Sequence, residues 1–270
     1  MLLLLLRVSI APLIVVGGTL VQRRFGNAIS GLVIGLPLTS LPLLWLVALQ
    51  HGGTFASSMS GAILVGATAQ VVVIWVYAFL AVRLPPALAM VGALGTFALT
   101  IAALHLLDLS VLFSTVLAAA GFAVALHWWP RTDFTSQETG RYRLALRVVL
   151  SAGFTLFVVT LAGRIGPGFS GLIAALPMMS LVMAFFTHQE LGANASAQFL
   201  HGVTRGSFSY VASMFVLAEM LRTGQVGPAF LCAIAVALVV QLGVQSWDTF
   251  PSLKRALSTP RFNSRISLRG

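Results

Sequence analysis

The stretch RRFGNAISGLVIGLPLTSL, residues 23–41, returns in altered form as GRIGPGFSGLIAALPMMSL, residues 163–181. Aligned without gaps, nine of the eighteen positions from 24 to 41 carry the same residue 140 positions later. Background residue usage would give about one or two identities. The first copy's shared residues are Arg24, Gly26, Ser30, Gly31, Leu32, Leu36, Pro37, Ser40 and Leu41. This similarity indicates an internal duplication.

The composition is that of a polytopic membrane protein. Hydrophobic residues make up 58% of the chain, charged residues make up 8%, and the mean hydropathy is +0.98. A soluble domain carries about a quarter charged residues. The single cysteine, Cys232, excludes a disulfide framework. The apolar residues 1–20 lack a basic segment ahead of the apolar run, so we expect a retained first helix rather than a signal peptide.

Nine apolar segments reach the length of about 20 residues that a membrane span needs. We expect helices at roughly 2–21, 27–50, 58–82, 86–107, 109–129, 144–163, 167–188, 199–221 and 227–247. The net charge of +10 resides at helix ends and in the tail, so we expect no nucleic-acid partner. Only Lys254 among the basic residues is a lysine, which is typical of a GC-rich bacterial genome.

Basic residues divide unevenly between the two sides that nine spans create. One side receives the loop with Arg23 and Arg24, the loop with Arg83, the central polar loop and the basic tail. The other side receives little beyond Arg164 and Arg222. The positive-inside rule therefore predicts a multi-pass protein of the bacterial inner membrane, with its N-terminus outside and its C-terminus in the cytoplasm.

The predicted fold is an all-α polytopic membrane protein of about nine transmembrane helices. The parts are a first four-helix repeat at 1–107, a linker helix and cytoplasmic loop at 108–143, a second four-helix repeat at 144–247 and a basic cytoplasmic tail at 248–270. Because one unpaired helix separates the copies, the second repeat enters the membrane inverted. Inverted repeats of this kind are typical of secondary transporters.

Each copy carries a proline near the middle of its second helix. Pro37 lies about 11 residues, roughly 16 Å, into the first copy, close to the middle of a bilayer core of about 30 Å. Proline removes an amide donor and frees the carbonyl four residues earlier, here that of Val33, and in the other copy Pro177 frees that of Ile173. The half-helix after such a break begins with partial positive charge. We expect the two helices to cross there and to offer a site for a small anion, a carboxylate or a lipid phosphate.

The crossing supplies most of the candidate substrate-binding residues. They are Ser30, Gly31, Pro37, Thr39, Ser40, Ser170, Gly171, Pro177 and Ser180, together with Arg205 from the eighth helix. A structural interpretation is equally open, because Ser-Gly pairs let helices pack closely and a proline in a membrane helix often only kinks it. Both interpretations can hold at once.

The eighth predicted helix carries ionisable residues, which are expensive inside a membrane. Arg205 and His201 lie one turn apart on the same face. Arg205 is a candidate for pairing an anionic substrate, and the alternative is a side chain that snorkels to the interface. Glu219 and His201 are the candidates for proton coupling, although an ion pair between Glu219 and Arg222 is the leading interpretation of that carboxylate.

Several signals of other functions are missing from the sequence. It has no HExxH, no Cys/His metal spacing, no glycine-rich phosphate loop and no GxSxG. We therefore expect no enzymatic activity, no cofactor and no metal site. The six carboxylates in 270 residues also weaken an ion-driven mechanism, although backbone carbonyls at broken helices can bind Na⁺.

Each half resembles a known family through the motif SGL-x-x-x-LP, at Ser30-Gly31-Leu32 with Pro37 and at Ser170-Gly171-Leu172 with Pro177. The motif is similar to the AGL-x-x-x-FP-like segment in the second helix of small four-helix inner-membrane proteins of the GlpM type. The resemblance implies a four-helix repeat unit and an association with alginate production. It carries over no substrate and no catalytic residue, and this chain departs from the family by fusing two copies through a linker helix.

The sequence thus predicts a permease of unknown substrate that works by alternating access around the crossing of its second and seventh helices. A small organic anion or an anionic lipid-linked intermediate is the expected substrate. The alternative is a non-transporting accessory protein of cell-envelope or polysaccharide synthesis, and a channel is a weaker third option. The expected partners are the lipid bilayer and the substrate, and a homodimer is left open.

Overall fold

The computed structural model of this chain describes residues 2–107, 109–130, 149, 172 and 174–258, and side chains only from residue 13 to 246 within these ranges, except at 105. Each regular element in the described ranges is a helix, so the predicted all-α class is confirmed there. The elements are α1 (Leu2–Phe25), α2 (Asn27–Ile34), α3 (Ser40–His51), α4 (Gly53–Ala81), α5 (Pro86–His105), α6 (Val111–His127), α8 (Met178–Leu191), α9 (Ala193–Met220), the 3₁₀ turn η1 (Leu221–Thr223) and α10 (Val226–Ser258).

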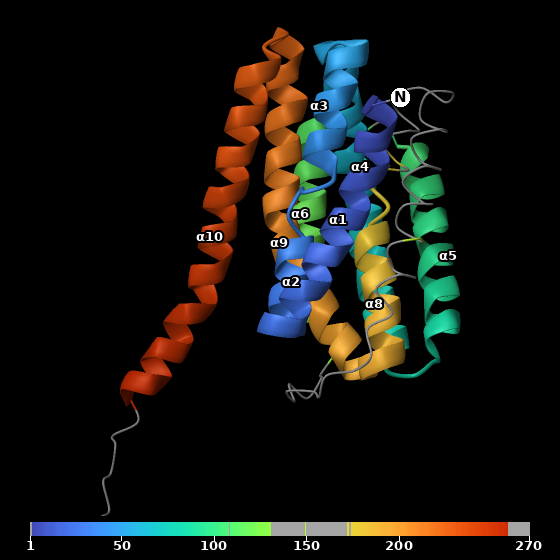
Figure 1. Ribbon diagram of the computed structural model, residues 1–270, viewed down its shortest axis with the longest axis vertical. Helices are drawn as coiled ribbons and strands as arrows, with labels where there is room; N and C mark the ends of the chain where they lie inside the picture. Colours follow the sequence, from blue (N-terminus) through green and yellow to red (C-terminus); the bar gives the residue numbers. More distant parts are fainter. Residues whose placement is uncertain (1, 108, 131–148, 150–171, 173, 259–270) are drawn as a thin grey trace, which may run out of the picture.

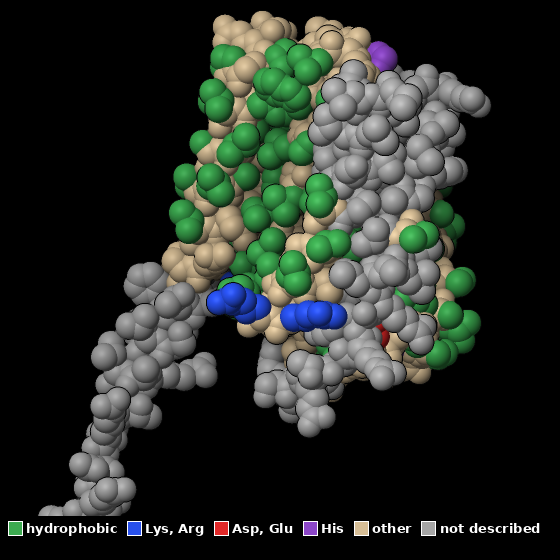
Figure 2. All heavy atoms as spheres, viewed as in Figure 1, with side chains coloured by type: hydrophobic (Ala, Val, Ile, Leu, Met, Phe, Trp, Pro, Cys, Tyr) green, Lys and Arg blue, Asp and Glu red, His purple; other side chains and the backbone are tan. Residues whose placement is uncertain are grey.

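Three of the described helices are long and apolar enough to cross a membrane, over Gly53–Ala81, Pro86–Leu104 and Val226–Ser246. In the most apolar window of α4, 61% of the residues are buried, against 17% in α5 and 28% in α10. The outer helices expose apolar side chains such as Leu99 and Leu238. Figure 2 shows hydrophobic side chains over much of one face and Lys and Arg side chains near its lower end. The exposed apolar faces of the outer helices indicate a membrane-associated protein. Three described helices meet the length and hydropathy of a membrane span, whereas the sequence predicts nine spans.

Several helices begin or end at residues other than those predicted from the sequence. The span expected at 27–50 is two helices, α2 and α3, with a non-helical break at residues 35–39. The helices expected to begin at 58 and 199 begin earlier, at Gly53 and Ala193. The hydropathy of the sequence does not predict these first turns because they contain polar residues. α10 continues through the start of the expected tail as far as Ser258. The expected span at 144–163, except residue 149, the polar loop at 131–143 and the first part of the span at 167–188 lie outside the described residues.

Helix starts recur with the same spacing of 140 residues as the sequence repeat. α4 begins at Gly53 and α9 begins at Ala193, and the starts of α5 and α10 are separated by the same interval. Gly52 before α4 has φ = 87° and Gly192 before α9 has φ = 89°, a backbone region that favours glycine. The correspondence between the two halves therefore extends well beyond the stretch that shows it in the sequence.

Corresponding helices run in opposite directions through the molecule (Figure 1). α3 joins α4 at the upper end of the view, whereas α8 joins α9 at the lower end. α4 and α9 pack against each other antiparallel, and the Ser57 hydroxyl near the start of α4 donates a 2.6 Å hydrogen bond to the Ala218 carbonyl near the end of α9. α5 packs on α4 and α8, α10 packs on α9 and α3, and α6 lies against both α4 and α9.

Two apolar clusters fill the interior, one toward each end of the α4–α9 pair. The first joins Phe122 of α6 to Met214 of α9 and the early part of α4. The second joins Tyr77 near the end of α4 to Phe199 and Val203 near the start of α9. Because lipid is as apolar as these side chains, dispersion contacts rather than escape from water hold such helices together inside a bilayer.

Candidate functional site

Pro37 interrupts the second predicted helix. α2 ends at Ile34, and the Leu38 amide donates to the Leu36 carbonyl at 2.7 Å across the proline. α3 then begins at Ser40, and the Leu41 amide donates to the Pro37 carbonyl at 3.0 Å. A proline lacks the amide hydrogen that an unbroken helix needs at this position, so the chain tightens into a narrow turn and starts a new helix.

The same arrangement occurs 140 residues later at Pro177. The Met178 amide donates to the Leu176 carbonyl at 2.8 Å, and the Leu181 amide donates to the Pro177 carbonyl, also at 2.8 Å. α8 begins immediately after the proline. Both copies therefore contain a half-helix whose first amides have no acceptor within the helix, which is where partial positive charge collects.

The expectation that Val33 leaves an unpaired carbonyl at the break is wrong. The Leu36 amide reaches back to the Val33 carbonyl at 3.2 Å, and the Gly35 amide reaches the Gly31 carbonyl at 2.8 Å. A tight turn at the end of α2 thus takes over the hydrogen bonds that the proline removes. Ile173, the corresponding residue of the second copy, lies outside the described residues.

The serines that follow the two breaks are inside the protein. Ser40 is 6% exposed and Ser180 is 4% exposed, while Thr39 is half-buried. Ser40 lies near the Tyr210 hydroxyl of α9. The starts of α3 and α8 therefore lie inside the helix bundle.

α2 crosses α9 backbone to backbone through four glycines. A Cβ atom on Gly35 would lie 2.6 Å from the Val203 carbonyl oxygen, and one on Gly31 would collide with the backbone of α9. Cβ atoms on Gly202 and Gly206 would collide with the backbone of α2. No residue larger than glycine fits these positions without moving a helix.

The corresponding contact appears at the other long helix. Gly66 of α4 stands 140 positions before Gly206, and a Cβ atom on it would collide with the Ala175 side chain and lie 3.5 Å from the Leu172 carbonyl oxygen. Ala175 is itself the counterpart of Gly35. Each long helix therefore packs closely against the broken helix of the other repeat.

The glycine spacing behind this crossing is visible in the sequence, but the predictions above do not include it. Gly31 and Gly35, like Gly202 and Gly206, have the GxxxG spacing by which membrane helices approach each other. Only Gly31 of these four glycines is among the predicted site residues. Ser30 also serves packing, since its hydroxyl donates to the Gly18 carbonyl of α1 at 2.8 Å. Ser170 and Gly171, the predicted counterparts of Ser30 and Gly31, lie outside the described residues.

The ionisable candidates of α9 do not gather at the crossing. The Arg205 guanidinium donates to the Val244 carbonyl of α10 at 3.1 Å. The His201 ring meets the Trp129 ring edge to face, with centroids 5.3 Å apart. The Glu219 carboxylate lies 3.2 Å from Arg222 at the far end of α9. Glu219 thus lies far along α9 from His201 and Arg205, and the three groups are not assembled around one substrate position.

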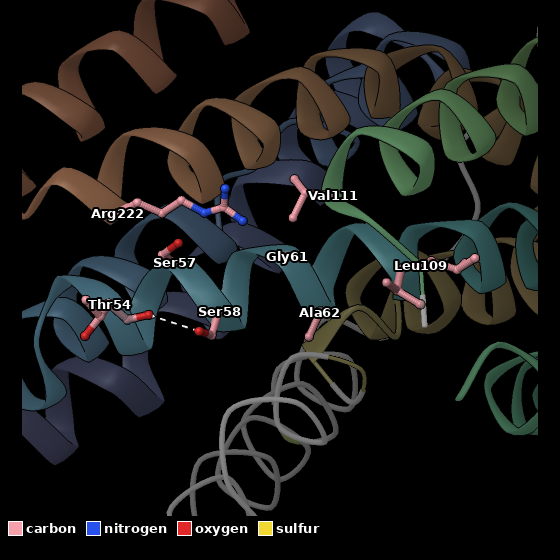
Figure 3. A pocket seen from close by; sticks show the side chains of 9 residues that line it. Thr54, Ser57, Ser58, Gly61, Ala62, Leu109, Val111 and Arg222 are labelled. Atoms are coloured by element: carbon pink, nitrogen blue, oxygen red, sulfur yellow. Dashed lines mark hydrogen bonds between the residues drawn. The ribbon is translucent and has the colours of Figure 1, made fainter. Parts of the chain in front are cut away.

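A cavity of about 430 Å³ lies at the start of α4, away from the prolines (Figure 3). Its described lining comes from α4, the segment leading into α6, and η1, and consists of Thr54, Ser57, Ser58, Gly61, Ala62, Val65, Leu109, Val111 and Arg222. Among the described residues no three His, Cys, Asp or Glu side chains lie close enough to hold a metal ion. Comparison with protein-family models, curated proteins and solved structures gave no match.

We expect Gly31→Ala and Gly206→Ala each to destabilise the protein by about 2–3 kcal/mol, because each added methyl group meets rigid backbone. The matched control is Gly95→Ala in α5, where a Cβ atom finds nothing within 4 Å. Thermal unfolding of the three purified variants in detergent measures the difference. If the first two unfold at the temperature of the control, the backbone contact between α2 and α9 is wrong.

Proposed function

We propose that this protein is a bacterial inner-membrane permease with two inverted four-helix repeats, which moves its substrate by alternating access around two broken helices. The observation that carries the proposal is the paired interruption at Pro37 and Pro177, in repeats whose corresponding helices run in opposite directions. Secondary transporters commonly place their sites at broken helices beside a pseudo-two-fold axis in the membrane plane.

The proposed topology has nine spans, with the N-terminus outside and the C-terminus in the cytoplasm. Arg23 and Arg24 end α1, and Arg83 follows α4, at the lower end of Figure 1. Arg222 follows α9 at the upper end, paired with Glu219. This distribution supports a cytoplasmic lower end under the positive-inside rule.

The proposed substrate is a small organic anion or an anionic lipid-linked intermediate. The half-helices α3 and α8 begin at the two interruptions, where their first amides favour negative charge. Rocking of one repeat against the other would expose this region to each side in turn.

One observation favours a second function, that of a non-transporting accessory protein of cell-envelope synthesis. Ser40 and Ser180 are buried, and the glycine crossing packs α2 tightly against α9. A static scaffold would be built in this way and would co-purify with the enzymes it positions. The two functions differ in whether the proline breaks are needed for activity or only for assembly.

We expect Pro37→Ala and Pro177→Ala to slow transport in proteoliposomes at least tenfold at normal expression, because each restores an amide donor and favours an unbroken helix. Pro86→Ala is the control, since Pro86 occupies the first turn of α5 and interrupts no helix. The readout is uptake, efflux or lipid scrambling across a broad panel of anions. No activity above protein-free liposomes, or variants that only fail to assemble, would favour the accessory protein.

The topology predicts opposite accessibility for two exposed positions. In a Cys232→Ser background, Thr223→Cys after α9 should react with a membrane-impermeant maleimide in intact spheroplasts. Leu84→Cys after α4 should react only after the membrane is opened. The reverse pattern would invert the topology, and labelling of both positions in intact spheroplasts would contradict the predicted number of spans between them.

A further inference from the structure

We propose that the cavity at the start of α4 is an outward-facing binding site for a small hydroxylated organic anion. The inference rests on the proposed permease function and narrows its substrate. The cavity of about 430 Å³ is within the size range of small-molecule sites, roughly 300–1,000 Å³. It lies at the upper end of α4, the end assigned to the outside (Figures 1 and 3).

The hydroxyl groups of the cavity are oriented to accept hydrogen bonds. Ser57 donates its proton to the Ala218 carbonyl at 2.6 Å, and Ser58 donates its proton to the Thr54 carbonyl at 3.1 Å. A hydroxyl that has given its proton to a backbone carbonyl still offers two lone pairs. The two serine oxygens are therefore suited to a ligand that brings O–H donors of its own.

Arg222 supplies the positive charge of the cavity. Figure 3 shows its side chain reaching over Ser57 toward Val111. Its ion pair with Glu219 is 3.2 Å long and exposed, with 61% of the Arg222 side chain and 40% of the Glu219 side chain open to solvent. Exposed ion pairs are worth about 0–1 kcal/mol, so an anionic ligand can compete for the guanidinium. Glu219 is the carboxylate beside Arg222, and it is not among the described lining residues of the cavity.

The remaining wall is apolar and shaped by a glycine. Val65, Leu109 and Val111 face the cavity, and Gly61 adds no side chain beneath it. A Cβ atom on Gly61 would lie 3.3 Å from a Val111 methyl group, so a larger residue would narrow the space between α4 and α6. A short carbon chain with hydroxyls along one edge and a negative charge at one end matches this arrangement of groups.

The other repeat carries larger side chains at the corresponding position. The counterpart of Gly61 is His201, whose ring packs on Trp129 just beyond the end of α6. The counterpart of Val65 is Arg205, which is bonded to the Val244 carbonyl of α10. The two ends of α6 thus meet equivalent places on α4 and α9, and the place on α9 carries larger side chains than the place on α4. A difference between the two ends is expected of an outward-facing state of the permease.

The experiment compares three probes of similar size on the protein in nanodiscs, by isothermal titration calorimetry. Gluconate carries both hydroxyls and a negative charge, hexanoate carries only the charge, and glucose carries only hydroxyls. We expect gluconate to bind at least tenfold more tightly than either. Equal binding of gluconate and hexanoate, or of gluconate and glucose, or no binding of any probe, would overturn the inference.

Two variants and a control assign the binding to this cavity. Arg222→Gln should remove the advantage of gluconate over glucose, and Ser58→Ala should reduce its advantage over hexanoate. Ser58 is exposed, so its loss does not threaten the fold, unlike the loss of buried Ser57. Arg83→Gln removes an exposed arginine at the opposite end and should leave all three affinities unchanged. If it weakens gluconate binding as much as Arg222→Gln does, the cavity is not the site.

The inference and the proposed function fail separately. Transport of a panel solute by a protein that does not discriminate among the three probes would overturn the inference and leave the permease standing. Selective gluconate binding that Arg222→Gln removes, with no transport in proteoliposomes, would uphold the site and refute the permease.

Discussion

The contact between the backbones of α2 and α9 is the constraint on which the remaining structure depends. Four glycines let the two helices touch through carbonyl oxygens and Cα atoms, so their separation is fixed by backbone rather than by adaptable side chains. In lipid, where apolar helices gain little by leaving the solvent, such close approach is a principal source of affinity between them. The position of α2 then fixes the place in the bundle at which Pro37 interrupts the helix. As a result, Ser40 at the start of α3 lies near Tyr210. Gly66 and Ala175 make the equivalent contact in the other repeat.

The spacing of 140 residues recurs in the framework but not in the side chains at the two ends of α6. The spacing of 140 residues holds for the glycines before α4 and α9 and for the starts of the helices that follow them. The side chains at equivalent places have diverged, since His201 stands where the other copy has Gly61. α6, which has no counterpart, contacts both places, with Val111 at one end and Trp129 just past the other. Equivalent places on α4 and α9 thus carry a glycine at one end of α6 and a histidine ring packed on Trp129 at the other.

The sequence predicted what depends on local covalent chemistry. A proline in mid-span removes an amide donor, so the positions of both breaks followed from Pro37 and Pro177 alone. The partner of the Val33 carbonyl did not follow, because it depends on how tightly α2 ends. Nor did the bond from Arg205 to Val244, which joins residues 39 positions apart on neighbouring helices. The cavity forms where α4, α6 and η1 pack together, and no residue spacing in the sequence predicts it. The GxxxG pairs are visible in the sequence and indicate which face of each helix packs closely against another helix. They do not indicate which two helices are partners.

Gly52 separates α3 from α4 by a single residue, and this leaves the connection little slack. α3 is 12 residues long, about 18 Å, and links the interruption at Pro37 directly to the first turn of α4. One end of α3 therefore lies at the interruption beside Pro37, and the other lies next to Thr54 in the wall of the cavity. In the proposed permease, a change of angle at Pro37 would displace Thr54 through this stiff helix, and Gly192 joins α8 to α9 by the same single-residue connection. The movement would then need no long chain of side-chain contacts between the interruption and the cavity.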